Sequence, residues 1–350
     1  MIYTPNIFDA NEDVSNFLLA EEMEWPIEFG KYSRFYHIAT ESVKDYMQHM
    51  NSNIDNALTV GASADQGIAL TNNGAKNVYF FDINKADYYY IILKKYALMY
   101  LKRQEFLDFI IGEKNKNIME YRLYKKLENV LPKSVKLFWD KVYNTFNYRH
   151  DLMAYYLFRS PNEHSKVSRK INDYYINNNS YYETQNKVKN SNWYFIESDF
   201  YDLHKTIPSN INFDSIVLSN IYEYLNFGGN VSLDKATKYI SYIKNTLIPK
   251  LNNNGNILLS YFYRYNDDIN SFIESSLKNN PNGWVRSDGL FSLDKLEAYT
   301  SGYTSQNVAY YYLLKELVKT LDIEKITTTS AGYGISSANT DLALIYKKTL

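Results

Sequence analysis

The stretch NALTVGASADQGIALTNNGAKNVYFFDIN, residues 56–84, combines small residues and an acid at a spacing that can hold a nucleoside. A first apolar run is followed by Gly61, Ala62 and Ser63. Small side chains let a ligand approach the main chain, and the N–H groups at the start of a helix attract a carboxylate or a phosphate. A second apolar run ends at Asp82, which could accept hydrogen bonds from both hydroxyls of a ribose. The spacing therefore predicts a nucleoside site.

Two neighbouring residues extend this candidate site. Asp65 opens the helix that follows the small residues, where its charge suits the helix dipole. Contact between its carboxylate and an amino group of the ligand is the alternative. Ile83 directly follows the second apolar run and is expected to lie beside the bound nucleoside. The turn reads GASADQG and lacks the second glycine of the dinucleotide motif G-x-G-x-x-G, which argues against a NAD-dependent oxidoreductase but leaves it as an alternative.

A strand, a helix and a second strand must position these residues. We predict strands over 57–60 and 78–81, with a helix over 64–72 between them. Strands joined in this way run parallel, through a right-handed crossover. A long helical pattern follows over 84–111.

The segments on either side of this unit have different patterns. Residues 1–55 read as an irregular entry with a helix near 40–50, and we expect them to form an N-terminal helical cover. Tyr36 and His37 lie in SRFYHIATES, a segment that could cover a ligand from this side.

Residues 113–190 break the alternation of strand and helix. Their first half has apolar residues at mostly helical spacing, which predicts a helical insertion. The stretch 160–190 is polar and is expected to be a mobile loop, either a lid over the site or a long surface connection.

The alternation then resumes. The predicted strands are 193–200, 213–220, 252–264, 324–332 and 340–348, and the predicted helices are 233–251 and 304–321. Gly255 is expected to take a positive φ in a turn before the third of these strands. Turn-forming residues and no helix join the last two strands, so we expect them to be antiparallel. The pattern predicts an α/β fold with a doubly wound, mostly parallel seven-stranded sheet and a C-terminal antiparallel strand.

The motifs and their order resemble class I S-adenosylmethionine-dependent transferases. LTVGASADQG resembles the first motif of that family, and VYFFDIN resembles its ribose motif. FIESDFYDL resembles the segment in which an acid contacts the adenine amino group, and FDSIVLSNIYEYL resembles the motif beside the methionine part. The resemblance implies S-adenosyl-L-methionine as the cofactor. It also implies a Rossmann-like methyltransferase fold over 56–350, with the helical insertion at about 113–190.

The resemblance assigns two residues to the adenine end. Asp199 is expected to contact the adenine amino group, and Phe200 follows it in the same segment. Glu197 and a plain helix-capping role for Asp199 remain alternatives.

The resemblance assigns five consecutive residues to the methionine end and the acceptor. Ser219, Asn220, Ile221 and Tyr222 follow the fourth predicted strand and are expected to line the methionine side. Tyr222 and Glu223 are the catalytic candidates, because they could orient or deprotonate an acceptor. Ordinary surface positions are the alternative for both.

A narrower resemblance concerns the group that is transferred. VGASADQGIALTNNGAKNVYFFDIN, together with EFLDFIIG and FDSIVLSNIYEYL, resembles the 3-amino-3-carboxypropyl transferases known from betaine-lipid synthesis. That family implies release of 5′-methylthioadenosine, whereas a methyltransferase would release S-adenosylhomocysteine. A binding protein that keeps the pocket without turnover is a further alternative. No basic amphipathic helix supports a lipid acceptor, so we expect a small-molecule acceptor.

Composition narrows the remaining classes of function. The 350 residues carry a net charge of −1 and no cysteine, so we expect neither a nucleic-acid partner nor disulfides. The five histidines show no metal-like spacing, and no apolar run is long enough to span a bilayer. We expect a cytoplasmic protein without stable membrane insertion, of open oligomeric state. The 36 tyrosines fit an AT-rich genome better than dedicated stacking surfaces.

Overall fold

The computed structural model describes residues 2–22, 31–52, 54–112, 118–158, 171–225, 233–265, 304–329 and 340–349. Seven strands in these residues form one sheet, in the order β3-β2-β1-β4-β5-β7-β6. The strands are β1 (Asn56–Val60), β2 (Asn77–Asp82), β3 (Asn192–Glu197), β4 (Phe213–Val217), β5 (Leu251–Tyr265), β6 (Ile323–Thr329) and β7 (Thr340–Lys347). Strands β1 to β4 pair in parallel, whereas β7 is antiparallel to both β5 and β6. The predicted fold class, a Rossmann-like methyltransferase sheet, is confirmed.

The described chain divides into two compact units, and each is treated by itself. The first ends at Val217 and the second begins at Leu218. Strands β1 to β4 therefore belong to the first unit, and strands β5 to β7 belong to the second.

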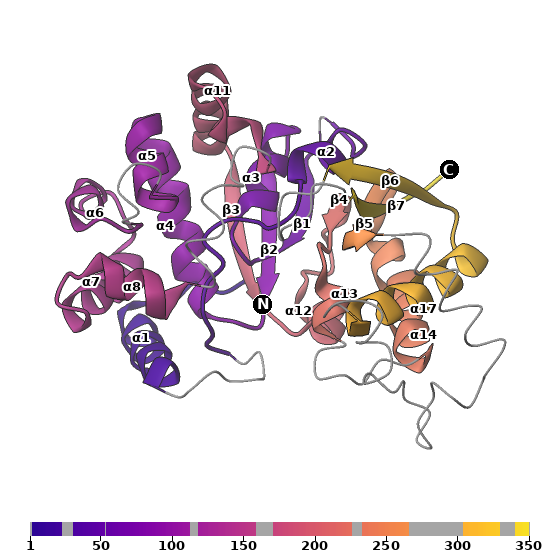
Figure 1. Cartoon of the computed structure of the whole chain (residues 1–350), viewed down its shortest axis with the longest axis horizontal. Helices are drawn as coiled ribbons and strands as arrows, with labels where there is room; N and C mark the ends of the chain where they lie inside the picture. Colours follow the sequence, from indigo (N-terminus) through magenta and orange to yellow (C-terminus); the bar gives the residue numbers. More distant parts are fainter. Residues whose placement is uncertain are drawn as a thin grey trace. The chain divides into compact units, whose positions relative to one another are not determined.

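Helices of the first unit flank its four strands. They are α1 (Ile7–Glu22), α2 (Val43–Met47), α3 (Asp65–Asn72), α4 (Ala86–Tyr100), α5 (Arg103–Ile110), α6 (Tyr121–Leu127), α7 (Lys133–Thr145), α8 (His150–Leu157), α11 (Asn178–Lys189) and α12 (Leu203–Thr206), with 3₁₀ turns η1 (Asp173–Tyr175) and η2 (Phe200–Asp202). Helices α1 and α7 lie side by side beyond α4 (Figure 1). Helix α1 is not among the predicted helices, and α2 is shorter than the predicted 40–50. The described residues within the predicted insertion, about 113–190, form α6, α7, α8, η1 and α11.

Helix α3 packs closely on β2, and this contact explains Gly67. A Cβ atom added at Gly67 would lie 2.2 Å from ring atoms of Phe80. Phe80 is 1% exposed and its ring also lies 4.9 Å from that of Trp193, so it has little room to move. The glycine is therefore required for the distance between helix and sheet.

Tyrosine side chains fill much of the interior. The largest fully buried side chains among the described residues are Trp139 and eleven tyrosines. Tyr89 stacks on Phe138 with ring centroids 4.1 Å apart, and the Trp139 indole N–H donates to the Tyr89 carbonyl at 3.0 Å. These tyrosines therefore serve as core residues with a polar end that needs a partner.

The predicted helix over 84–111 is wrong at its centre. Helix α4 ends at Tyr100, and Leu101 adopts an extended conformation with ψ of 152°. Helix α5 restarts directly afterwards, where the Glu105 carboxylate accepts the Lys102 backbone N–H at 3.1 Å. No glycine or proline lies at this break, and the apolar residues keep their spacing through it. The sequence pattern therefore does not reveal the break.

The predicted mobile loop over 160–190 is wrong for its second half. Residues 178–189 form α11, and the Asn177 side chain caps it by accepting the Ser180 N–H at 2.9 Å. Tyr181 is fully buried, and its hydroxyl donates to the Leu101 carbonyl at 2.9 Å. Residues 160–170 of the predicted lid, 160–190, lie outside the described residues.

The second unit contains α13 (Ile221–Tyr224), α14 (Leu233–Tyr242) and α17 (Thr304–Thr320). The predicted helix over 233–251 is α14 followed by a π turn (Ile243–Leu247) and a 3₁₀ turn (Ile248–Lys250). Pro249 lies in the last turn, where its missing N–H prevents a regular continuation.

The role predicted for Gly255 is also corrected. Asn254 takes the left-handed conformation, with φ of 61°. Gly255 is needed for space instead, because a Cβ atom there would lie 2.9 Å from the Asn252 carbonyl oxygen.

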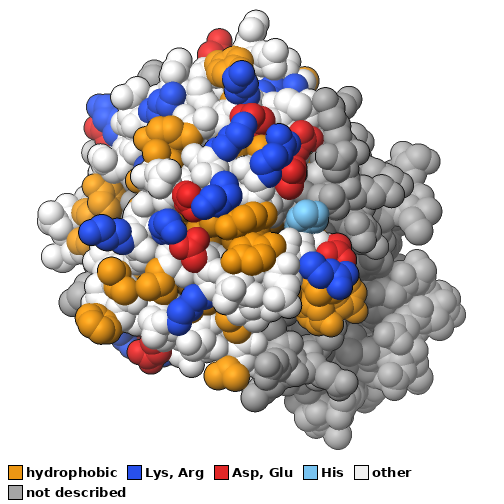
Figure 2. Space-filling view, turned by 90° about the vertical axis from the view of Figure 1, so that its left-hand side faces the viewer, with side chains coloured by type: hydrophobic (Ala, Val, Ile, Leu, Met, Phe, Trp, Pro, Cys, Tyr) orange, Lys and Arg blue, Asp and Glu red, His pale blue; other side chains and the backbone are white. Residues whose placement is uncertain are grey.

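The described surface mixes charge with apolar side chains. Figure 2 shows lysine or arginine and acidic side chains interspersed with hydrophobic ones over one face. In the described part of the chain, no helix is long and apolar enough to cross a membrane.

Replacing Gly67 with alanine tests the helix–sheet contact. We expect the free energy of unfolding to fall by about 1–3 kcal/mol, because the methyl group overpacks against Phe80. Urea denaturation followed by circular dichroism measures this loss. The control is Gly67→Ala combined with Phe80→Leu, which removes the ring atoms nearest to the new Cβ. Phe80→Leu alone is the reference for the double variant, and a loss from Gly67→Ala that is as large in the Phe80→Leu background as in the wild type would contradict the prediction.

Candidate functional site

The register of β1 and β2 brings the turn after β1 beside Asp82. Val60 pairs with Phe81, and the Gly61 N–H donates to the Phe81 carbonyl at 2.8 Å. The Ala62 N–H then donates to Asp82 Oδ2 at 3.4 Å. The predicted proximity of the acid and the turn amides is therefore present in the structure.

Gly61 is required by this proximity. A Cβ atom added there would lie 3.0 Å from the Cβ atom of Asp82 and 3.2 Å from its Oδ2. The absence of a side chain makes room for Asp82 directly beside the turn.

The rest of the turn has unusual backbone geometry. Ala62 and Ala64 both have positive φ, at 37° and 67°. This conformation costs roughly 1–2 kcal/mol in a residue with a Cβ atom. The Ala64 N–H closes the turn by donating to the Gly61 carbonyl at 3.1 Å, and α3 begins at the next residue. Ser63 is fully buried within the turn.

Asp82 is partly buried but keeps some exposure to solvent. Its Oδ1 accepts the Asn84 N–H at 3.0 Å. Burial raises the pKa of the Asp82 carboxyl, while the N–H groups of Asn84 and Ala62 act in the opposite direction. Ile83 follows at the same edge and is also partly exposed.

Asp65 has a different environment, inside the protein. Its side chain is fully buried and forms an ion pair with Lys94, whose Nζ lies 3.0 Å from Oδ1. The other donors to this carboxylate are Ala39 N at 2.6 Å, Ser63 Oγ at 3.0 Å, the Tyr175 hydroxyl at 2.9 Å and the Tyr174 hydroxyl. Of the two predictions for Asp65, this environment favours a role in the fold over a contact with the ligand.

The segment after β3 also lies beside Asp82. The Ser198 N–H donates to the Asp82 carbonyl at 2.9 Å. Asp199 Oδ1 accepts the Tyr201 N–H at 2.9 Å and caps η2, while Phe200 is 3% exposed. Capping, one alternative for Asp199, is therefore observed.

Glu197, the other alternative, faces lysines. It pairs with Asp82 across β2 and β3, and its carboxylate lies 3.5 Å from Lys85 Nζ and 3.8 Å from Lys31 Nζ. Two ammonium groups already balance this acid.

The five residues predicted for the methionine end and the acceptor belong to the second unit. Ser219 has a φ of 56°, and its hydroxyl donates to Asn220 Oδ1 at 3.2 Å. The Asn220 amide in turn donates to Glu223 Oε2 at 3.2 Å. Ile221 begins α13, which carries the partly exposed Glu223. The four residues therefore form one hydrogen-bonded turn.

Tyr222 differs from its neighbours because it is fully buried. Its ring lies 4.9 Å from that of Tyr239 in α14. From this buried position, Tyr222 can support the turn that carries Glu223.

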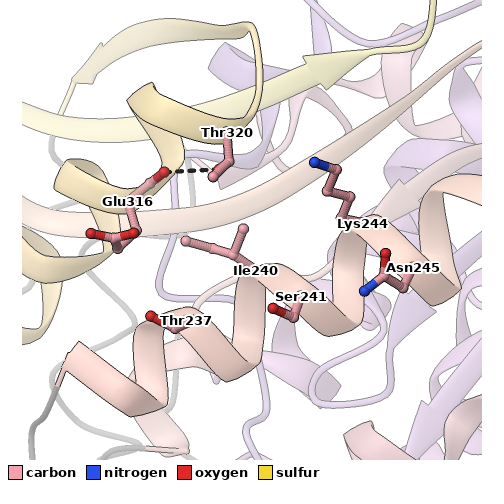
Figure 3. Close-up of a pocket in the computed structure, with 7 residues that line it drawn as sticks. All are labelled: Thr237, Ile240, Ser241, Lys244, Asn245, Glu316 and Thr320. Atoms are coloured by element: carbon pink, nitrogen blue, oxygen red, sulfur yellow. Dashed lines mark hydrogen bonds between the residues drawn. The ribbon is translucent and has the colours of Figure 1, made fainter.

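The second unit also contains a groove. It has a volume of about 250 Å³ and runs between α14 and α17, with Ile240, Lys244 and Glu316 among its lining residues (Figure 3). None of the predicted site residues lines it.

Lys94 is the residue that sequence reasoning missed. The sequence does contain a signal for it. Lys94 lies within the apolar run YYYIILKKYALMY, among the residues of α4 that are buried. A lysine on a buried face requires an internal partner such as an acid. Among the described residues, no group of three histidine or acidic side chains is placed to hold a metal ion.

Comparisons with known proteins give only distant likenesses. No family model matches the sequence, and no curated protein matches it. Among solved structures, the N-methyltransferase NodS from Bradyrhizobium japonicum WM9 shares 9% identity, with coverage of 88% of this chain and 93% of that chain and a TM-score of 0.32. The glycopeptide N-methyltransferase MtfA, complexed with S-adenosylmethionine, shares 8% identity over 92% of this chain and 99% of that chain, with a TM-score of 0.35.

A third solved structure is similarly distant. The plantazolicin methyltransferase BpumL shares 13% identity over 97% of this chain and 87% of that chain, with a TM-score of 0.30. All three TM-scores lie below 0.5, so the fold assignment depends on this chain's own strand order and strand directions.

Replacing Ala64 with glycine tests the strain in the turn. Glycine adopts a positive φ without the Cβ penalty, so we expect the free energy of unfolding to rise by up to about 1 kcal/mol. The matched control is Ala69→Gly in α3, where glycine should lower stability by about 1 kcal/mol. Thermal and urea unfolding of both variants measures the difference. Equal losses in the two variants would show that the turn is unstrained.

Proposed function

We propose that this chain is an S-adenosylmethionine-dependent transferase that acts on a small acceptor. The observation that carries the proposal is the 3.4 Å approach of the Ala62 N–H to the Asp82 carboxylate, at the carboxyl ends of two adjacent parallel strands. In open α/β sheets, ligands bind outside the carboxyl ends of the strands. The partly exposed acid beside this turn fits a nucleoside with an amino-acid tail.

Each residue of the first unit has a proposed role. Asp82 would accept hydrogen bonds from the ribose hydroxyls, with Ile83 beside the nucleoside. The turn at Gly61, Ala62 and Ser63 would lie beside the carboxylate end of the cofactor, where the dipole at the start of α3 is favourable. Asp65 would hold the turn in place.

The residues after β3 are proposed for the adenine end. Asp199 would contact the adenine amino group and Phe200 would pack beside the ring. The cap that Asp199 forms on η2 uses Oδ1, which is compatible with a contact through Oδ2.

In the second unit, Ser219, Asn220 and Ile221 are proposed to contact the methionine part. Glu223 is proposed to orient or deprotonate the acceptor, since the Asn220 amide holds one of its carboxylate oxygens. Tyr222 is proposed to support that turn from the interior. The bound cofactor would supply an electrophilic carbon beside its sulfonium, and placement of the acceptor is the protein's main contribution.

Two groups are candidates for transfer. The fold is that of methyltransferases, which favours methyl transfer and release of S-adenosylhomocysteine. The motif resemblance favours the 3-amino-3-carboxypropyl group and release of 5′-methylthioadenosine. Fold alone does not decide function, so product identity must separate the two.

Incubation with S-adenosylmethionine and a panel of small amines and alcohols tests the proposal. We expect mass spectrometry to detect one of the two nucleoside products, depending on the carbon that the acceptor attacks. Tight cofactor binding without product from any acceptor would favour the non-catalytic alternative. Calorimetric binding of NAD without binding of S-adenosylmethionine would overturn the proposal in favour of an oxidoreductase.

Cofactor binding should depend on pH through Asp82. Ribose hydroxyls donate to the ionised carboxylate, so affinity is full above the pKa of Asp82 and falls as the pH drops through it. Because burial raises this pKa above 3.8, the loss should begin at a higher pH than an exposed aspartate would give. Calorimetric dissociation constants measured from about pH 8 down to about pH 4 test this expectation.

The control for the pH dependence is Asp82→Asn, which cannot titrate. Hydrogen bonds to a charged group contribute roughly 1.5–3 kcal/mol, so we expect about 10- to 100-fold weaker binding at neutral pH and no step at acidic pH. An identical pH curve for the wild type and this variant would remove Asp82 from the site.

A further inference from the structure

Lys94 connects segments that are distant in the sequence. Its ammonium group is fully buried and donates to the Ser63 carbonyl at 2.8 Å and to the His37 carbonyl at 3.0 Å. Its third partner is Asp65 Oδ1, at 3.0 Å. An ammonium has three N–H donors. Each of the three therefore serves a different structural element: the turn after β1, the chain before α2, and the start of α3.

The chain before α2, residues 31–39, is here called the N-terminal strap. One end of it exchanges two hydrogen bonds with the Asn84 side chain, Ser33 N to Oδ1 at 3.2 Å and Nδ2 to the Ser33 carbonyl at 3.1 Å. At the other end, the Ala39 N–H donates to Asp65 Oδ2 at 2.6 Å. The strap is thus fixed both to the chain that follows β2 and to the chain that follows β1.

The middle of the strap is held as firmly. The His37 carbonyl also accepts the Tyr90 hydroxyl at 2.6 Å, and the Phe35 N–H donates to the Leu157 carbonyl at 2.8 Å. The His37 ring is fully buried, with its centroid 6.0 Å from that of Phe158. The strap therefore runs along the edge that carries the turn and Asp82.

The ion pair cannot be satisfied by either segment alone. Burial lowers the pKa of Lys94, and the charge of Asp65 opposes this effect. A buried ammonium that loses an acceptor is left with an unmade hydrogen bond in a dry interior, which is costly. Displacement of the strap would remove the His37 carbonyl, and displacement of the turn would remove the Ser63 carbonyl.

We propose that Lys94 is a positioning residue that makes ordering of the N-terminal strap and ordering of the turn at 61–65 a single event. The turn contains two alanines with positive φ, and the bond from Lys94 to the Ser63 carbonyl holds it in that conformation. Loss of the ammonium should loosen both segments together. For the ligand, the inference rests on the proposed function: the turn that would hold the cofactor is aligned only when the strap is in place.

Hydrogen–deuterium exchange on the ligand-free Lys94→Met variant tests the coupling. We expect amides in the strap and in the turn to exchange at least tenfold faster than in the wild type, by similar factors. Lys95→Met is the matched control, because Lys95 lies on the same helix but donates to the Ser191 carbonyl at 2.9 Å and covers the Trp193 ring at 5.1 Å. Unchanged exchange in either segment of Lys94→Met, or equal changes in both variants, would overturn the proposal.

Chemical rescue separates positioning from general destabilisation. The chain has no cysteine, so Lys94→Cys provides a single thiol. Alkylation of the unfolded variant with 2-bromoethylamine, followed by refolding, restores an ammonium at nearly the length of lysine, whereas 1-iodopropane gives a neutral side chain of similar size. We expect protection of both segments to return to within twofold of the wild type only with the ammonium. Equal protection with the propyl group would overturn the proposal.

Calorimetry with S-adenosylmethionine completes the test. We expect the ammonium adduct to bind within twofold of the wild type and the propyl adduct to bind at least tenfold more weakly. If the wild type does not bind S-adenosylmethionine, the proposed function is rejected, and the exchange result alone decides whether the strap and the turn are coupled. Equal binding by both adducts, with a wild type that does bind, would reject the link between strap and cofactor.

Discussion

In the first unit, the positions of the N-terminal strap, the turn at 61–65 and the start of α3 depend on the buried ion pair between Asp65 and Lys94. Both side chains are fully removed from solvent, so each charge must find its partners inside the protein. The carboxylate draws donors from the strap, from the turn and from the segment with Tyr174 and Tyr175. These segments are held by one network, because a missing segment would leave a buried charge incompletely hydrogen-bonded.

Asp82 lies at the same edge but in the opposite situation. It is partly exposed, and its hydrogen bond with the Ala62 N–H is long, at 3.4 Å. Burial raises its pKa, and the backbone N–H groups of Asn84 and Ala62 oppose this effect. Of the two acids after β1 and β2, Asp65 is thus occupied by the fold, and Asp82 is the one that we propose for the ligand.

Tyrosines make this arrangement possible. Tyr90, Tyr174 and Tyr175 are fully buried or nearly so, and their hydroxyls bond to the strap carbonyl or to Asp65. A tyrosine buries a large apolar ring and still offers one polar atom to a network. The composition that looked like a consequence of nucleotide bias therefore also fills the core and satisfies its buried charges.

The amino-acid sequence by itself determined the seven strands, their parallel or antiparallel sense and the positions of Gly61 and Asp82 after two of them, because apolar runs and small-residue turns are local signals. It did not reveal the break after Tyr100 or helix α11 within a polar stretch, where long-range packing overrides the local pattern. Only the tertiary structure decided that Asp65 pairs with Lys94 and that Tyr222 is buried. These outcomes depend on which segments meet in space, and no spacing along the chain encodes that.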